Sequence, residues 1–178
     1  MSFIFSNSSI KIATLEDVVP VRDLLNSAYR GEESKKGWTT EADLIAGNVR
    51  ADEKIIREAM TAPGSVVLKY INDAGLIIGC VNLQQHVTRV YLGMFSVSPQ
   101  LQGAGIGKQL LKASEEYTKH LQCSSIYMSV ISVRDELINW YKRHGYVDTD
   151  ERKPFTEDGI TGKHLQKLEF MILEKSLC

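Results

Sequence analysis

The 178-residue chain has few cysteines, and their number and spacing argue against a disulfide-stabilised fold and against a cysteine-based metal site. Only Cys80, Cys123 and Cys178 are present, and none of them forms a C-x-x-C pair. Three widely spaced thiols do not make a disulfide framework, and they fit buried or incidental cysteines in a reducing compartment. The four histidines also lack the close spacing of metal ligands, so the sequence predicts no metal site.

Long apolar runs and an excess of charge of one sign are absent as well. No window approaches the roughly 18 apolar residues of a membrane span, so no membrane partner is expected. The segment from Met1 to Asn7 lacks the basic and apolar regions of a secretory signal, which makes cytoplasmic residence the expectation. The formal net charge of -1 differs from the strongly basic surface of nucleic-acid-binding proteins, and no nucleic-acid partner is expected.

What the sequence does contain is an alternation of strand and helix patterns. An apolar stripe from Val18 to Ala28 has helical spacing, and Asp17 before it is the predicted N-cap. Residues 30–40 read as a polar loop, after which Thr40 and Asp43 are predicted to cap a further helix. The other expected helices cover residues 52–61, 106–120 and 134–144, and the expected strands cover residues 10–13, 66–71, 76–83, 89–97, 125–131, 146–150 and 166–173.

The order of these elements predicts how the strands pair. The strand–helix–strand unit over residues 89–131 must cross over and pair in parallel, whereas the strands before it can pair as hairpins. A chain with 43% hydrophobic and 24% charged residues supports one domain with a substantial core. We therefore expect a single domain over residues 1–178, of the α/β or mixed α+β class, with helices covering a mixed sheet.

The most informative segment is glycine-rich and runs from Gln102 to Lys108. Glycines at a helix start allow close approach of a ligand, and the unpaired N–H groups and helix dipole there favour phosphate. A dinucleotide-binding G-x-G-x-x-G loop fails because its third glycine would be Lys108. A P-loop fails because Gln102 and Gln109 stand at its first and last positions. A glycine turn that serves tight packing alone is an alternative.

The segment Gln102-x-x-Gly105-x-Gly107 matches the Q/R-x-x-G-x-G/A signature of the GNAT acetyltransferases. It follows an apolar strand and precedes an amphipathic helix, and the element order resembles that family from about Ile10 to Leu173. The resemblance implies one N-acetyltransferase domain with a mixed, mostly antiparallel sheet of six to seven strands. It also implies an enzyme that moves an acetyl group from acetyl-CoA to a primary amine, by direct attack through a tetrahedral intermediate.

The resemblance further implies which residues hold acetyl-CoA. In this family the strand before the loop splays from its parallel neighbour, and the pantetheine arm pairs with free backbone groups in the gap. An N–H group near Phe95 is implied to stabilise the oxyanion. By position, the implied contacts are Phe95, Ser96 and Val97 for pantetheine, and Gln102, Gly103, Ala104, Gly105, Ile106, Gly107 and Lys108 for the diphosphate.

A second landmark, Tyr141-x-x-x-Gly145-Tyr146, resembles the Y-x-x-x-G-F/Y end of a family helix. Tyr141 matches the tyrosine that protonates the departing CoA sulfur, and a phenol with a pKa of about 10 can donate at neutral pH. The alternative is a core aromatic residue. Arg134 stands where many members carry a cofactor-contacting asparagine, so a phosphate contact and a helix cap are both open for it.

The acceptor site is less well marked. The candidates for a general base are Glu32, Glu33 and Glu41, with solvated surface charges and a water chain as the alternatives. Trp38 is the candidate wall of the acceptor site, since an aromatic ring can flank an amine, although ordinary loop anchoring also fits. The polar segment 152–164 is expected near the acceptor entrance. Glu33, Trp38 and Glu41 are therefore the predicted substrate-site residues.

Several partners stay open at this level. The acceptor can be a small-molecule or a peptide amine, and a homodimer is possible. One alternative function is a catalytically weak acyl-CoA-binding module with a regulatory role. Another is a nucleotide-binding domain of a different kind, which the failed P-loop and dinucleotide spacings disfavour.

Overall fold

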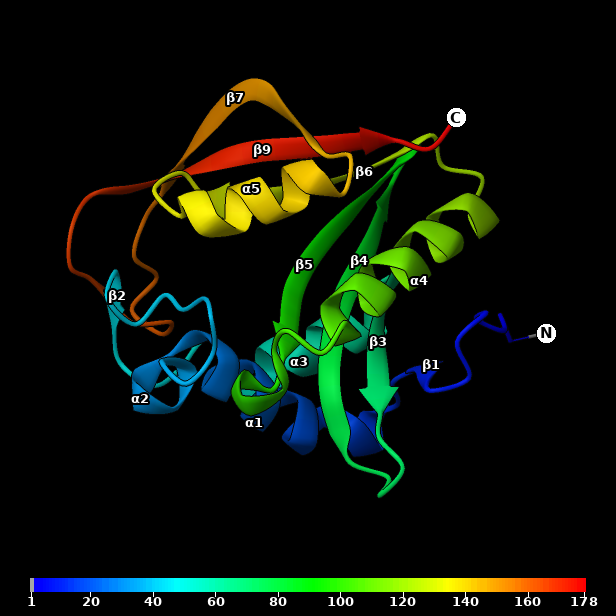
Figure 1. Ribbon diagram of the computed structural model, residues 1–178, viewed down its shortest axis with the longest axis horizontal. Coiled ribbons are helices and arrows are strands. Elements are labelled where there is room, and N and C mark those ends of the chain that lie inside the picture. Colours follow the sequence, from blue (N-terminus) through cyan, green and yellow to red (C-terminus); the bar gives the residue numbers. More distant parts are fainter. Residues whose placement is uncertain (1) are drawn as a thin grey trace.

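The computed structural model describes residues 2–178, and a seven-stranded mixed sheet lies at its centre (Figure 1). The strand order is β1-β3-β4-β5-β6-β9-β7. Within these residues, β5 and β6 are the one parallel pair, so the predicted mixed, mostly antiparallel sheet and its crossover are confirmed. The strands are β1 (Ile10–Ile12), β3 (Ser65–Ile71), β4 (Ile77–His86), β5 (Arg89–Val97), β6 (Ser125–Ile131), β7 (Val147–Phe155) and β9 (Leu168–Ser176).

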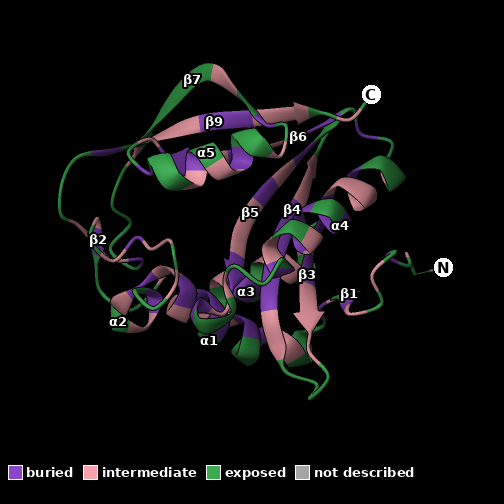
Figure 2. Cartoon of the chain, viewed as in Figure 1, coloured by how far each residue is buried: buried purple, intermediate pink, exposed green. Residues whose placement is uncertain are grey.

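Helices cover both faces of this sheet and bury their apolar sides against it (Figures 1 and 2). α4 (Ile106–His120) and α5 (Asp135–Arg143) share one core, and α1 (Val18–Tyr29) and α3 (Glu53–Thr61) share the other. The adjacent residues Val67 and Leu68 belong to opposite cores, as the alternation of side chains along a strand requires. The expected mixed α+β fold is confirmed.

The first long helix shows why its sequence folds there. The predicted apolar stripe of α1 is buried from Val18 to Ala28, which confirms the helical spacing. Asp17 does stand before the helix, but its carboxylate does not cap α1. It instead accepts the backbone N–H of Thr14 and forms a 2.6 Å ion pair with Lys69 of β3. Asp17 therefore ties the start of α1 to the sheet.

The predicted helix after Thr40 is wrong. Thr40 accepts the N–H of Ala42 and caps only a single turn, which leads into the short strand β2 (Ile45–Ala46). β2 pairs with β8 (Lys163–His164), an antiparallel contact across more than a hundred residues that local sequence does not announce. The predicted loop at 30–40 also contains a short helix, α2 (Gly31–Ser34).

The end of the strand expected over residues 146–150 is also corrected. β7 does not end at residue 150 but continues to Phe155, after a bulge at which Asp150 has a φ of 65°. The bulge restores pairing with β9, so the beginning and end of the segment 152–164 belong to strands rather than to one loop. Among residues 2–178, no helix combines the length and the apolar character that crossing a bilayer requires.

The feature that creates the site is the divergence of β5 from β6. Their parallel pairing covers only Arg89–Tyr91 against Ser125–Tyr127, and Figure 1 shows the two strands parting beyond it. A bulge in β5 adds to the bend, with Met94 at a φ of 52° and the register to β4 shifting there. The last six residues of β5 therefore have β4 on one side and an open gap on the other.

Candidate functional site

The glycine loop lies at the end of β5 and starts α4. Gly103 and Gly105 have φ angles of 87° and 84°, in the left-handed region that glycine adopts without penalty. Gly105 is the N-cap residue of α4, and no side chain caps the helix. The first N–H groups of a helix have no partner within it, so this turn presents donors together with the positive end of the helix dipole. Lys108 is exposed beside them, and no carboxylate among residues 2–178 pairs with it.

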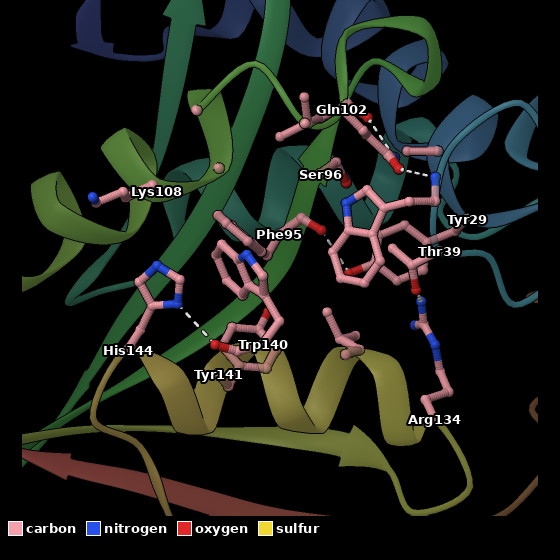
Figure 3. A pocket seen from close by; sticks show the side chains of 17 residues that line it. Tyr29, Thr39, Phe95, Ser96, Gln102, Lys108, Arg134, Trp140, Tyr141 and His144 are labelled. Atoms are coloured by element: carbon pink, nitrogen blue, oxygen red, sulfur yellow. Dashed lines mark hydrogen bonds between the residues drawn. The ribbon is translucent and has the colours of Figure 1, made fainter.

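A cavity of about 340 Å³ lies between this loop, the end of β5 and α5 (Figure 3). The predicted residues Gln102, Gly103, Gly105, Gly107 and Lys108 line it, whereas Ala104 and Ile106 lie in the same turn without doing so. A Cβ added at Gly107 would touch the rings of Phe95 and Trp140 at 3.6 and 3.7 Å. The absence of a side chain there keeps this end of the cavity open.

The open side of β5 contributes backbone groups to the cavity. The carbonyl of Phe95 accepts a 2.8 Å hydrogen bond from the Tyr29 hydroxyl, and the carbonyl of Val97 accepts one of 3.2 Å from Gln102. Both carbonyls thus point away from β4. Ser96 between them is paired in register with Cys80 of β4, so its contribution to the cavity is its side chain. Phe95 and Val97 are the residues whose backbone faces the gap.

The side chain of Gln102 connects two walls of the cavity. Its Nε2 donates to the Val97 carbonyl, while its Oε1 accepts the backbone N–H of Trp38 at 3.0 Å. Trp38 lines the cavity and is 46% exposed. The residue that begins the glycine signature therefore also anchors the loop that carries Trp38, and Figure 3 shows this pair of bonds.

Tyr141 points from α5 toward the gap between β5 and β6 (Figure 3). Its ring centroid lies 6.1 Å from that of Phe95, and the residue is 4% exposed. Burial raises the pKa of the Tyr141 phenol well above its ordinary value, with a smaller rise from Tyr29. Its hydroxyl has no hydrogen-bond partner among residues 2–178, so Tyr141 presents a protonated, uncommitted donor to the cavity.

Glu41 and Arg134 form a buried ionic cluster with Arg30. One carboxylate oxygen of Glu41 accepts from Arg30 and the other from Arg134, the latter at 3.0 Å. Arg134 also donates to the Thr39 hydroxyl at 2.5 Å. The cluster fastens the loop after α2 to the start of α5. Both oxygens of Glu41 are thereby engaged, and Arg134 borders the cavity while holding this loop.

The other two glutamates that were candidates for a base lie outside the cavity. Glu32 is 90% exposed and pairs with Lys35, and Glu33 pairs with Lys36 and accepts a hydrogen bond from Gln100. Neither lines the cavity beside the glycine loop. The structure therefore brings Trp38 and Glu41 to the site and leaves Glu33 on the surface of α2.

A second, smaller cavity of about 80 Å³ adjoins the first on the other side of the gap. The two share five residues: Tyr29, Phe95, Arg134, Leu137 and Tyr141. Sequence reasoning missed Tyr29, Trp140, His144 and Arg50. Trp140 and His144 flank the predicted tyrosine on α5 and could have been included on helical spacing, but nothing local marks Tyr29 or Arg50.

A splayed mixed sheet with a glycine loop beside the gap is the arrangement of the GNAT fold. The model of the Acetyltransferase (GNAT) family matches residues 19–146, and the chain belongs to this family. Spermine/spermidine N(1)-acetyltransferase of Bacillus subtilis (strain 168) is 36% identical over 59 residues, which are 33% of this chain and 39% of that protein. The similarity thus spans well under half the length of that curated relative.

Solved structures with the same fold cover most of the chain. An acetyltransferase of the GNAT family from Staphylococcus aureus Mu50 has a TM-score of 0.68 and 16% identity, over 95% of this chain and 98% of that one. Ribosomal-protein-alanine N-acetyltransferase from Brucella melitensis has a TM-score of 0.68 and 15% identity, over 94% and 98%. At these identities the likeness concerns the fold.

Proposed function

We propose that the protein is an N-acetyltransferase that moves an acetyl group from acetyl-CoA to a primary amine. The observation that carries this proposal is the open side of β5. Backbone groups of Phe95 and Val97 face a cavity that has left-handed glycines at one end and the unpartnered hydroxyl of Tyr141 at the other. A long, polar thioester with a diphosphate fits such a cavity.

In this proposal the donor lies along β5 with its diphosphate on the glycine loop. The N–H groups from Gln102 to Lys108 and the Lys108 ammonium hold the negative charge, as helix starts hold phosphates generally. The pantetheine amides pair with Phe95 and Val97, and the amide nearest Val97 replaces the Gln102 side chain on that carbonyl. Arg134 shapes this end of the cavity through its contacts with Thr39 and Glu41.

The chemistry is transfer of an acyl group between two nucleophiles. The amine nitrogen forms a bond to the thioester carbonyl carbon, and the negative charge moves to the oxygen, beside the N–H groups at the bulge of β5. The carbon–sulfur bond then breaks, and Tyr141 donates its proton to the departing sulfur. The nitrogen, positively charged since its attack, loses a proton as the amide forms, and that proton restores the Tyr141 phenol. Burial raises the pKa of the Tyr141 phenol above its ordinary value, so the phenol is protonated and can donate at neutral pH.

Removal of the proton from the incoming ammonium falls to water. Glu32 and Glu33 lie outside the cavity, and Glu41 has both oxygens engaged by arginines. A water relay from the open mouth of the cavity requires no carboxylate. The similarity to spermine/spermidine N(1)-acetyltransferase adds polyamines to the panel of amines to assay.

The proposal is tested with Tyr141→Phe. Loss of the donated proton is expected to lower turnover at saturating acetyl-CoA by about 10²–10⁴-fold, which is the usual contribution of general acid catalysis. CoA affinity, measured by calorimetry, should not change, because the hydroxyl makes no contact that holds the fold. Tyr117→Phe is the matched control, since Tyr117 lies on α4 in an aromatic cluster with Phe3 and His120, outside the cavity.

Unchanged turnover in Tyr141→Phe would remove Tyr141 from the mechanism. CoA binding without transfer to any member of a broad amine panel would contradict the enzyme itself. That second result would favour the acyl-CoA-binding regulatory module.

A further inference from the structure

The smaller cavity is where an acceptor would meet the thioester. It adjoins the donor cavity at Phe95 and Tyr141, which lie where the acyl group changes partners in the proposed reaction. Its remaining walls come from strands β5, β6, β7 and β9 and from the segment before α3. An amine that enters here reaches the thioester from the side opposite the glycine loop.

The charged residues of this cavity are two arginines and one glutamate. Glu41 and Arg134 pair with each other, and Glu41 also binds the buried Arg30. Arg134 also pairs with Glu136 at 3.7 Å, so the cluster has two guanidinium groups and two carboxylates. Its buried nitrogens Arg30 Nη2 and Arg134 Nε have no hydrogen-bond partner among residues 2–178. Both oxygens of Glu41, the one carboxylate that lines the cavity, are therefore already bonded to arginines.

Arg50 is the remaining charge, and nothing in the described chain neutralises it. No carboxylate among residues 2–178 lies within 4.0 Å of its guanidinium, and no hydrogen bond is formed by its side chain there. The guanidinium lies 5.2 Å from the centroid of the Tyr29 ring. Arg50 therefore adds an unpaired positive charge to a half-buried position beside the reacting groups.

The position of Arg50 is fixed by the fold. Asn26 of α1 accepts the N–H groups of Arg50 and Ala51 at 2.7 and 3.0 Å, and donates to the Ala51 carbonyl at 3.1 Å. One turn further along α1, the hydroxyl of Tyr29 is bonded to the Phe95 carbonyl. The Tyr29 side chain thus lies between the Arg50 guanidinium and the backbone of β5 at Phe95. A small molecule is long enough to contact both.

We propose that Arg50 binds a carboxylate on the acceptor, so that the substrate is a small primary amine that also carries a carboxylate. This inference rests on the proposed N-acetyltransferase function and names the acceptor class. The carboxylate would neutralise Arg50 and leave the amine directed at the thioester. A polyamine would instead bring two or more positive charges to a cavity whose net lining charge is positive and whose one carboxylate is engaged.

Hydrogen bonds to charged groups contribute about ten- to hundredfold in binding. The wild-type protein should therefore use 2-amino acids with a kcat/KM that exceeds that of the corresponding amino acid amides by this factor. The amide keeps the primary amine and removes only the negative charge. Rates are compared per concentration of neutral amine, because the two compounds differ in amine pKa. Spermidine completes the panel and should be a poor acceptor.

Arg50→Gln should abolish the preference for acid over amide while leaving kcat/KM for the amide within about threefold of the wild type. Arg50→Lys, which keeps the charge but not the forked donor, should restore part of the preference. Arg57→Gln is the matched control, because Arg57 is an exposed residue of α3 and its substitution makes the same change in net charge. A loss of preference confined to Arg50→Gln supports the proposal.

Three results would overturn it. One is a wild-type protein that prefers spermidine to every amino acid. Another is an acid-to-amide ratio that stays the same in Arg50→Gln, which would give Arg50 a structural role only. The third is CoA binding with no transfer to any amine. It would contradict both the N-acetyltransferase function and this inference, whereas the first two results contradict the inference alone.

Discussion

Glu41 joins residues that lie far apart in the sequence, since it bonds Arg30 at the end of α1 and Arg134 before α5. Glu41→Gln would leave the buried guanidinium of Arg30 without a counter-charge and Arg134 with Glu136 alone, at 3.7 Å. Breaking a buried ion pair from one side costs about 3–5 kcal/mol. We therefore expect the free energy of unfolding, measured by denaturant titration, to fall by about that amount.

Glu32→Gln provides the comparison for this variant. Glu32 is 90% exposed and pairs with Lys35 three residues later, and such surface pairs contribute about 0.5 kcal/mol or less. The two substitutions make the same chemical change, one on α2 and the other in the loop after it. Equal losses of stability in both would show that the buried cluster does not hold the loop.

Single residues differ in how well the sequence revealed them. The glycines of the loop and Tyr141 stand in short motifs whose spacing is local, so the chain alone indicated them. Tyr29 acts on Phe95, 66 positions later, and no local pattern records that contact. Likewise, the sequence shows that Glu33 and Glu41 are acidic but not which of them is buried between arginines.

The start of α4 can be tested with a graded pair of substitutions at Gly107. A Cβ there lies at ordinary contact distance from Phe95, Val97 and Trp140, so Gly107→Ala fits. The two further methyl groups of Gly107→Val enter the cavity. We expect at least a tenfold loss of CoA affinity by calorimetry in the valine variant and a change of threefold or less in the alanine variant.

Stability distinguishes this effect from damage to the helix. Alanine should stabilise α4 by up to about 1 kcal/mol over glycine, and valine should not destabilise it. A valine variant that keeps full CoA affinity would place the donor elsewhere. A valine variant that unfolds at lower denaturant concentration than the wild type would contradict the packing described for Gly107.

Elements with strong local patterns were predicted well, and elements made by distant pairing were not. The helix expected over residues 52–61 is α3, which Asp52 caps by accepting the N–H of Ile55 and which ends before Pro63. β2 and β8 have two residues each and exist only because they pair with one another. The extension of β7 likewise depends on a bulge that re-establishes its register with β9.

Alkaline pH should destabilise the whole molecule through its buried tyrosines. Burial raises the pKa of Tyr29 to about 12, and it also raises the pKa values of Tyr141 and Tyr146. Unfolded tyrosines ionise near pH 10, so above about pH 10 the unfolded chain releases protons that the folded one retains. The contribution of these three tyrosines to the free energy of unfolding should be constant below about pH 10. Above that pH it should fall by up to about 1.4 kcal/mol per pH unit for each tyrosine.

A pH titration followed by the ultraviolet absorbance of tyrosinate measures this ionisation directly. No more than four of the seven tyrosines should ionise while the circular dichroism stays native, and the other three should ionise in the unfolding step. Complete ionisation of all seven in the folded protein would contradict the burial described here.

At the scale of the whole molecule, the parallel pairing of β5 with β6 was predictable from the order of elements, because a strand–helix–strand unit has few other solutions. How early that pairing stops was not, since it depends on the bulge at Met94 and on the packing of α5 beneath the gap. The glycine motif therefore predicted the acetyl-CoA side of the site from the sequence, whereas the shape of the gap could be seen only in the structure.

The divergence of β5 and β6 also has a consequence for self-association. Unpaired strand edges normally lie at the rim of a sheet, where they can recruit strands of other chains and seed aggregates. Here two such edges face each other in the middle of the sheet, with α4 and α5 on one face and Tyr29 bonded to one edge. The molecule thus offers free backbone groups to a slender ligand while shielding them from another polypeptide.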